Sequence, residues 1–168
     1  MQPVLTRVDF RLIHGQVVTY WIPSLGIEHI VLVNDSVKHD YSVMQIMQYT
    51  KPLNCSISFY TLDEAVELWN EEKLMRKEKR NLLLFESITD VYYCFEKGMK
   101  IENLQLGNLP FGPGKTNISS MYFLSDEEAA CLEKMSLKGM DIVFNATGNI
   151  KITDWSSVRN RYFKDLNI

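Results

Sequence analysis

The chain has 168 residues, of which 46% are hydrophobic and 23% are charged, and its formal net charge is −3. This balance is typical of a folded domain and excludes a disordered or fibrous chain. It also argues against nucleic acid as the main partner, because binding to the phosphate backbone requires a basic face. No apolar run approaches the ~20 residues of a membrane-spanning helix, and no secretion signal is recognisable. We therefore expect a cytoplasmic protein.

Apolar runs of strand length alternate with helical patterns along the first half of the chain. They predict the strand Val4–Val8, the helix Gly15–Trp21, the strand His29–Val33, the helix Tyr41–Tyr49, the strand Ser56–Tyr60 and the helix Leu62–Lys77. Asp40 is expected to cap the second of these helices. The last helix is indicated by apolar residues at positions i, i+3, i+4 and i+7, beginning at Leu62.

The second half continues the alternation. It predicts the strands Leu82–Phe85, Asn103–Leu106, Ser119–Leu124 and Ile142–Asn145, and the helices Ile88–Lys97, Ser125–Lys138 and Thr153–Phe163. Residues 107–115 join two strands without a helix between them. The whole order predicts one domain over residues 1–168 with an α/β fold. Its mostly parallel seven-stranded sheet should carry helices on both faces and one late antiparallel strand.

Cysteines and histidines give no sign of a metal or a cofactor. The cysteine count is odd and no C-x-x-C pair occurs, which argues against a zinc ribbon or a disulfide scaffold. The three histidines, His14, His29 and His39, lack the spacing of metal ligands. His29 begins a predicted strand and is expected to be structural, whereas His39 should lie at the rim of the cleft described next.

The loop after the first strand is the strongest candidate site. In an open α/β sheet, ligands bind outside the carboxyl ends of the strands. Residues 9–16 read DFRLIHGQ and lead into a helix, whose free backbone N–H groups and positive end favour an anion. Arg11 adds a forked cation suited to phosphate, and Gly15 lets an anion approach the backbone closely.

A histidine beside such an anion site has a specific chemical use. A neutral imidazole nitrogen of His14 can attack phosphorus while the surrounding donors hold the phosphoryl oxygens. Asp9 would orient either Arg11 or the other ring N–H, and the sequence leaves both open. Asp35, after the second strand, would hydrogen-bond the ring or simply begin a turn. A structural histidine held in a turn is the alternative reading of His14.

Residues 7–21, RVDFRLIHGQVVTYW, resemble a known signature. They are similar to the pattern R-[IV]-D-[DN]-R-[LF]-[IL]-H-G-Q-V…W of the mannose/fructose/sorbose family of phosphotransferase-system IIB components. The similarity continues in Val33–Asp35, Lys51–Pro52 and Leu106–Asn108, and the strand–helix order agrees over essentially the whole chain.

The resemblance implies an enzyme that carries a phosphoryl group. His14 would accept it from a phosphohistidine on a IIA component and pass it to a sugar that enters through the membrane subunits IIC and IID. The chain would then associate with these subunits at the membrane periphery. Arg11 matches the phosphate-site arginine of the family. The remaining positions expected to bind or orient the phosphate are Asp9, Leu12, Ile13, Gly15, Gln16 and Asp35.

Two departures from the family pattern motivate an alternative. Phe10 replaces a common acidic or amide residue and offers an apolar surface for docking. Residues 145–148, NATG, replace a Q-x-V-P-like stretch, which puts the contacts of the carboxyl-terminal part in question. A regulatory module that docks partners without turnover would fit these changes.

A third hypothesis is a small-molecule enzyme with His14 and Asp35 as acid and base, which predicts a deep pocket. A carrier that meets two protein partners should instead have His14 at an accessible surface. The sugar, the reactive ring nitrogen and the presence of a homo-oligomer stay open.

Overall fold

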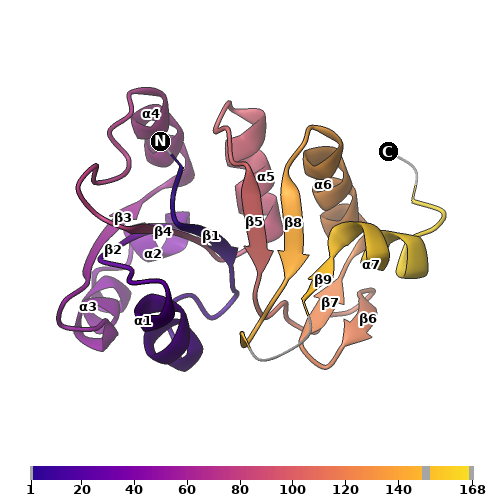
Figure 1. Cartoon of the computed structure of the whole chain (residues 1–168), viewed down its shortest axis with the longest axis horizontal. Coiled ribbons are helices and arrows are strands. Elements are labelled where there is room, and N and C mark those ends of the chain that lie inside the picture. Colours follow the sequence, from indigo (N-terminus) through magenta and orange to yellow (C-terminus); the bar gives the residue numbers. More distant parts are fainter. Residues whose placement is uncertain (1, 149–151, 167–168) are drawn as a thin grey trace.

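The computed structural model describes residues 2–148 and 152–166. Its main sheet has seven strands in the order β3-β2-β4-β1-β5-β8-β9 (Figure 1). The strands are β1 (Leu5–Val8), β2 (His29–Val33), β3 (Ser56–Tyr60), β4 (Asn81–Phe85), β5 (Asn103–Leu106), β8 (Asp141–Phe144) and β9 (Thr153–Asp154). All neighbours are parallel except β8 and β9, which are antiparallel. The α/β class, the seven strands and the late antiparallel strand are confirmed.

Helices pack against both faces of the sheet. One helical run, η1 (Val17–Trp21) and α1 (Ile22–Ser24), lies with α3 (Tyr41–Thr50) against one face, over β2, β3 and β4. The other face is covered by α4 (Leu62–Asn70), α5 (Ile88–Glu96) and α6 (Asp126–Leu137). The helix α2 (Asp35–Lys38) follows β2 directly, and α7 (Trp155–Tyr162) ends the described fold. Figure 1 shows β5 and β8 in front of α5 and α6, with no helix drawn before them.

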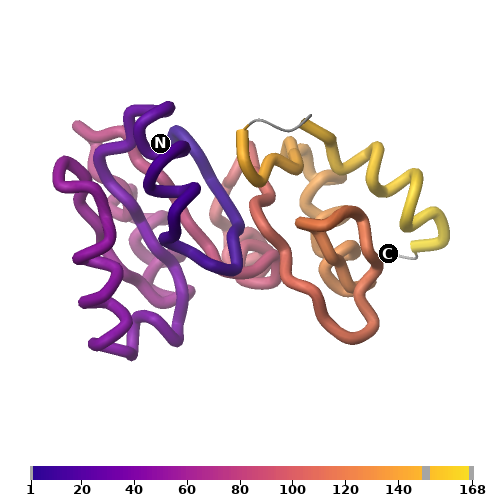
Figure 2. Tube along the Cα trace, turned by 90° about the horizontal axis from the view of Figure 1, so that it is seen from below, coloured from indigo at the N-terminus to yellow at the C-terminus, as the bar shows by residue number. Residues whose placement is uncertain are grey.

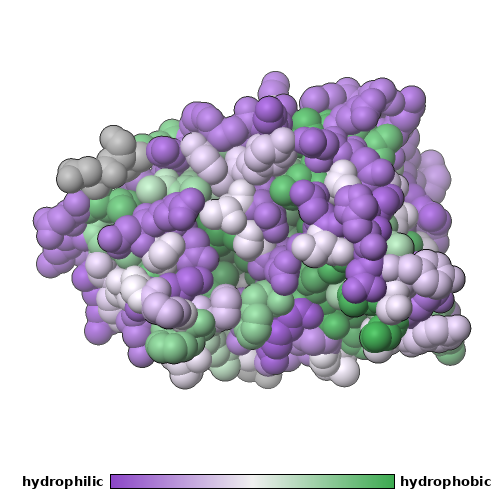
Figure 3. All heavy atoms as spheres, turned by 180° about the vertical axis from the view of Figure 1, so that it is seen from behind, coloured by the Kyte–Doolittle hydropathy of each residue, from purple (hydrophilic) through white to green (hydrophobic). Residues whose placement is uncertain are grey.

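The two halves of the chain lie next to each other along the long axis. Figure 2 shows the first residues, in indigo and purple, at one end and the last, in orange and yellow, at the other. Seen from behind, the surface is mainly hydrophilic, with apolar side chains in small groups (Figure 3). No helix in the described ranges is long and apolar enough to cross a membrane.

Local capping explains why most helices begin where the sequence predicts. Asp40 accepts a hydrogen bond from the backbone N–H of Val43 (3.0 Å), as expected for the cap of α3. Ser125 and Glu128 form a reciprocal capping box at the start of α6. The acidic first turn of α6 adds favourable charge at the positive helix end.

The predicted strand Ser119–Leu124 is right only for its two ends, Ser119 and Tyr122–Leu124, and these residues do not belong to the main sheet. The residues around it form a separate antiparallel hairpin of β6 (Thr116–Ser119) and β7 (Tyr122–Leu124). The seventh strand of the main sheet is β9 instead, which the sequence analysis assigned to the last helix. Asp154 explains this, because its side chain caps α7 while its own backbone is extended and pairs with β8.

The predicted helix Leu62–Lys77 is too long, because α4 ends at Asn70. Glu72 has a positive φ of 58°, which no helical residue adopts, and it reverses the chain. The backbone N–H groups of Lys73 and Leu74 then bond back to the carbonyl oxygen of Leu68, at 2.8 and 3.1 Å. The first helix, by contrast, is longer than predicted and continues past Trp21 to Ser24. The short helix α2 was not predicted at all.

Candidate functional site

The loop after β1 lies where the strand order changes direction. From β1 the chain builds β2, β3 and β4 on one side of it, and then β5 and β8 on the other. The carboxyl end of β1 is therefore a topological switch point, the usual ligand position in such sheets.

A tight turn places His14 just below the surface at this point. The N–H of Leu12 donates to the carbonyl oxygen of Asp9 (2.9 Å), and Leu12 has a positive φ of 52°. This turn directs the side chains of Leu12 and Ile13 into the core, where they are 3% and 9% exposed. The side chain of His14 keeps 13% exposure, and its carbonyl accepts the N–H of Val18 at the start of the helix.

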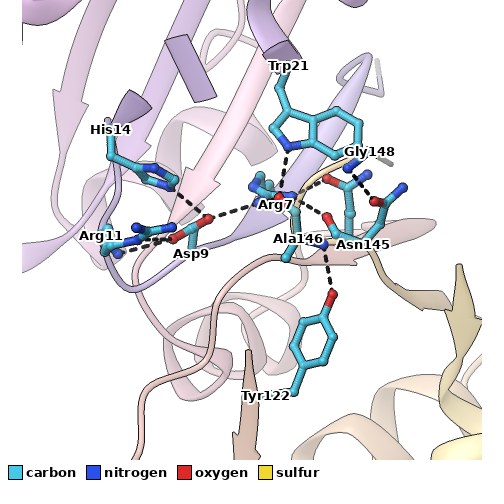
Figure 4. Close-up of polar contacts among 10 residues, drawn as sticks. Arg7, Asp9, Arg11, His14, Trp21, Tyr122, Asn145, Ala146 and Gly148 are labelled. Carbon is cyan, nitrogen blue, oxygen red and sulfur yellow. Dashed lines mark hydrogen bonds and ion pairs between the residues drawn. The ribbon is translucent and has the colours of Figure 1, made fainter. Parts of the chain in front are cut away.

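Asp9 is the centre of the site (Figure 4). Its carboxylate is fully buried, and its Oδ2 lies 2.9 Å from Nη2 of Arg7 and 3.0 Å from Nε2 of His14. Its Oδ1 accepts the backbone N–H of Arg11 (3.3 Å), whose guanidinium Nε is 4.0 Å away. Burial alone would raise the pKa of Asp9, but hydrogen bonding from His14 and the charge of Arg7 lower it overall. Asp9 is therefore ionised at neutral pH.

Arg7 is a buried cation that the sequence analysis did not single out. Its guanidinium donates to Oε1 of Gln105, to the carbonyl oxygens of Asn145 (2.8 Å) and Ala146 (2.9 Å), and to Asp9. Burial lowers the pKa of Arg7, and the charge of Asp9 opposes that shift. The sequence did contain a sign of this pair. A charged residue inside a core strand needs a partner, and Asp9, two positions after Arg7, faces the same side of the strand.

Gly107 makes this close packing sterically feasible. A Cβ at this position would lie 2.5 Å from Nη2 of Arg7 and 2.5 Å from Oδ2 of Asp9. The Gly107 N–H also donates to the carbonyl oxygen of Val8 (2.7 Å), which joins β5 to the start of the His14 loop. A larger residue would displace the ion pair that supports the site.

The start of the helix leaves donors available for an anion. Among the described backbone hydrogen bonds, none is donated by the N–H groups of Ile13, His14 or Gly15. A Cβ at Gly15 would meet no atom within 4 Å, so this side is open. Oε1 of Gln16 is buried without a partner in the described part of the chain. The free N–H groups and the open side at Gly15 match an anion site of the kind that the sequence predicts, whereas the Gln16 oxygen is an acceptor and does not favour an anion.

Asp35 also follows the carboxyl end of a strand, but in the described part of the chain it does not bond to His14. Its Oδ1 accepts the N–H of Leu62 (2.8 Å) and its carbonyl oxygen lies 2.7 Å from Nδ1 of His39, so it links α2 to the start of α4. No hydrogen bond or ion pair to His14 is found for it within the described residues. The structure thus brings together Asp9, Arg11 and His14 of the predicted set and leaves Asp35 outside this group.

Phe10 and Arg11 are the exposed part of the loop. The Phe10 side chain is 38% exposed, and the guanidinium of Arg11, itself 43% exposed, lies 5.8 Å from the centre of its ring. The Phe10 N–H donates to the carbonyl oxygen of Asn108 (3.3 Å), which ties this loop to residues 107–115. Five cavities in the described part of the chain are lined by residues other than His14. Within the described ranges, no cluster of three His, Cys, Asp or Glu side chains could hold a metal ion.

The family described as "PTS system sorbose subfamily IIB component" matches residues 3–166. The chain belongs to this IIB family. It is 25% identical to the sorbose-specific EIIB component of Klebsiella pneumoniae over 142 residues, which cover 84% of the chain and 85% of that protein. It is also 28% identical to the mannose-specific EIIAB component of Escherichia coli K12 over 138 residues, which cover 82% of the chain.

The IIB chain spans only 42% of the length of that EIIAB relative. Its fold superimposes on the crystal structure of the IIBSor domain of the sorbose permease from Klebsiella pneumoniae with a TM-score of 0.86. This superposition covers 97% of the chain and 99% of that domain at 22% identity. The architecture described above is therefore the architecture of this family.

Proposed function

We propose that this IIB chain is a phosphocarrier of a sugar phosphotransferase system, with His14 as the residue that carries the phosphoryl group. The observation that supports this most strongly is the contact between Nε2 of His14 and the buried, ionised Asp9, at 3.0 Å. A carboxylate at this distance favours the ring form with the proton on Nε2. The lone pair is then on Nδ1, the nitrogen that we assign as the nucleophile.

The proposed reaction has two transfers. In the first, Nδ1 attacks phosphorus on the phosphohistidine of a IIA protein, and the donor's N–P bond breaks. In the second, a sugar hydroxyl attacks phosphorus on His14, the N–P bond breaks with its electron pair returning to Nδ1, and the hydroxyl proton passes to water. Arg11 and the free N–H groups of residues 13–15 would hold the phosphoryl oxygens, and Asp9 would stabilise the positive charge that develops on the ring.

The partners proposed for this chain follow from the same chemistry. A IIA protein would donate the phosphoryl group, and IIC and IID subunits would present the sugar, so the chain would work in the cytoplasm at the membrane periphery. The name of the mannose-specific EIIAB relative supports the IIA partner. The relatives carry different sugar names, mannose and sorbose among them, so the substrate is proposed only as a sugar. Residues 1–168 would act as one domain, without metal or cofactor.

The two alternatives fit less well. A docking module without turnover does not require a histidine that contacts a buried ion pair. The relatives also bear the names of phosphotransferase components. A small-molecule enzyme with Asp35 as the second acid–base group would need that carboxylate near His14. Asp35 instead accepts the N–H of Leu62.

The test is phosphoryl transfer from a purified phosphorylated IIA protein. We expect one labelled histidine in the natural chain and no label in the His14→Ala variant. His39→Ala is the matched control, because His39 is an exposed histidine at the same edge of the sheet and should leave labelling unchanged. Label retained in folded His14→Ala would refute the site assignment.

A further inference from the structure

We propose that Arg7 is a positioning residue for phosphoryl transfer, which acts on His14 only through Asp9. This inference rests on the proposed role of His14. Arg7 is fully buried and is far too enclosed to meet a phosphoryl group or a partner protein. Its influence on the reaction must therefore pass through the groups that it contacts.

The contacts define a relay of two steps. Nη2 of Arg7 and Nε2 of His14 meet the same oxygen of Asp9, Oδ2, at 2.9 and 3.0 Å. The other oxygen, Oδ1, accepts the backbone N–H of Arg11. The carboxylate is thus held at both ends, and the side that faces His14 is fixed by the guanidinium on the opposite side (Figure 4).

The guanidinium is itself anchored by parts of the chain far from the His14 loop. The backbone carbonyl oxygens of Asn145 and Ala146 accept from its two terminal nitrogens, and the ring of Trp21 lies 5.1 Å from its central carbon. Nε1 of Trp21 donates to the carbonyl oxygen of Ala146 (3.4 Å), and the N–H of Ala146 donates to the hydroxyl of Tyr122 (2.8 Å). Arg7 therefore connects the segment after β8 to the orientation of the reactive ring.

A lysine cannot reproduce this arrangement. Its ammonium keeps the charge, but it lacks the planar fork that reaches Asp9 and two backbone carbonyls at once. We expect Arg7→Lys to fold and to leave the Asp9 carboxylate less well oriented. Because a small misplacement of a reacting group slows transfer strongly, the rate constant for phosphorylation by phospho-IIA should fall about tenfold or more.

The chain provides a matched control in Arg159. This arginine also pairs with a carboxylate, Glu133 (3.5 Å), and donates to two backbone carbonyls, those of Phe163 (2.6 Å) and Lys164 (3.0 Å). A tryptophan N–H, from Trp155, reaches the same carboxylate at 2.6 Å. Arg159 is 21% exposed, so Arg159→Lys should lower thermal stability less than Arg7→Lys does, and it should leave the rate of phosphoryl transfer unchanged.

A double-mutant cycle separates positioning from a merely structural role. Asp9→Asn should slow transfer, and the double variant Arg7→Met with Asp9→Asn should be no slower than Asp9→Asn alone. The double variant removes both buried charges together and so avoids the unpaired ion that could unfold Arg7→Met by itself. A folded double variant that is slower than Asp9→Asn would overturn the proposal, because it would mean that Arg7 acts by another route.

The ring of His14 provides a readout that does not depend on turnover. Nitrogen-15 NMR of the histidine rings should show the proton on Nε2 of His14 in the natural chain and in Arg159→Lys, and a mixture of both ring forms in Arg7→Lys. An unchanged ring form together with an unchanged rate in folded Arg7→Lys would overturn the proposal. If the natural chain shows the Nε2–H form but takes no label from phospho-IIA, the proposed function fails while the relay itself still stands.

Discussion

At the scale of single residues, Asp9 resolves a choice that the sequence left open. The sequence allows it two roles, orienting Arg11 or holding the ring of His14. The structure shows both contacts, one on each carboxylate oxygen, together with the ion pair to Arg7. One buried carboxylate therefore connects the buried cation, the exposed cation and the imidazole. The predicted role of Asp9 in phosphoryl transfer stays a prediction.

Replacing Asp9 tests that role directly. Asp9→Asn keeps the shape but removes the charge that we propose stabilises the ring during transfer, and the amide can present its NH2 group instead of an acceptor. We expect the rate of transfer from phospho-IIA to fall about 100-fold, as for the loss of an electrostatic contact in an active site. Rapid-quench kinetics with radiolabelled phosphate measures this rate. A folded variant with an unchanged rate would remove Asp9 from the mechanism.

The dependence of the folding stability on pH at acid pH also follows from Asp9. The pKa of Asp9 is lowered in the folded chain, so its ionised form stabilises the fold above its ordinary pKa of 3.8. This contribution is lost as the pH falls through the lower folded pKa.

At the scale of elements, local signals were sufficient for the starts of helices but not for every end. Capping residues such as Asp40 and Ser125 lie within three residues of the groups they bind, so the pattern is visible in the sequence. The end of α4 depends on the left-handed conformation of Glu72, a residue that carries no turn signal. The strand β9 has two residues and exists only because β8 offers it an edge.

Two loops at the edge of the sheet each carry an exposed phenylalanine, Phe10 in one and Phe111 in the other. Residues 9–15 and 107–115 are joined by the bond from Phe10 to Asn108. Phe111, in the second loop, is 78% exposed and its ring packs edge-on against Phe123 of the hairpin, with ring centres 5.5 Å apart. Exposed aromatic residues beside a reactive group are suited to binding a partner protein.

We predict that Phe111→Ser weakens docking of the phosphodonor. The KM for phospho-IIA should rise several-fold while the maximal rate changes little, because Phe111 packs against Phe123 and is not part of the group formed by Asp9, Arg11 and His14. Leu137→Ser is the matched control, since Leu137 is 72% exposed on α6 and should leave both constants unchanged. Steady-state transfer assays measure both variants. Equal KM values for all three proteins would exclude Phe111 from the docking surface.

Residues 145–148, which differ from the usual family pattern, contact Arg7 through their backbone. The contacts of this segment with Arg7 are made by the backbone oxygens of Asn145 and Ala146. A change of side chains can leave such contacts in place. This explains how the chain departs from the family pattern here and still builds the support beneath Asp9.

At the scale of the whole molecule, His29 couples folding to pH. It is buried at the start of β2, where its Nδ1 lies 2.7 Å from the hydroxyl of Ser56. Burial, helped by the charges of Arg76 and Lys79, lowers the pKa of His29 from 6.5 to about 4. The unfolded chain therefore binds a proton that the folded chain rejects between these two pH values.

Stability should therefore fall as the pH drops from about 6.5 towards 4, by up to about 1.4 kcal/mol per pH unit for one proton. Urea unfolding followed at several pH values measures this slope. The variant His29→Gln, which cannot take up the proton, should show a flatter profile over the same range. A natural chain with the same slope as the variant would contradict the assignment to His29.

The sequence by itself determined most of the succession of strands and helices, the parallel α/β class and the loop that holds Arg11 and His14. These follow from hydrophobic periodicity, capping and the resemblance of residues 7–21 to a known signature, all of which are local in the chain. Only the tertiary structure decided that Asp9 meets Arg7 and His14, that Asp35 does not join them, and that residues 145–148 support the site. The reason is physical: these contacts join residues up to 139 positions apart, and such pairing depends on how the sheet brings its strands together.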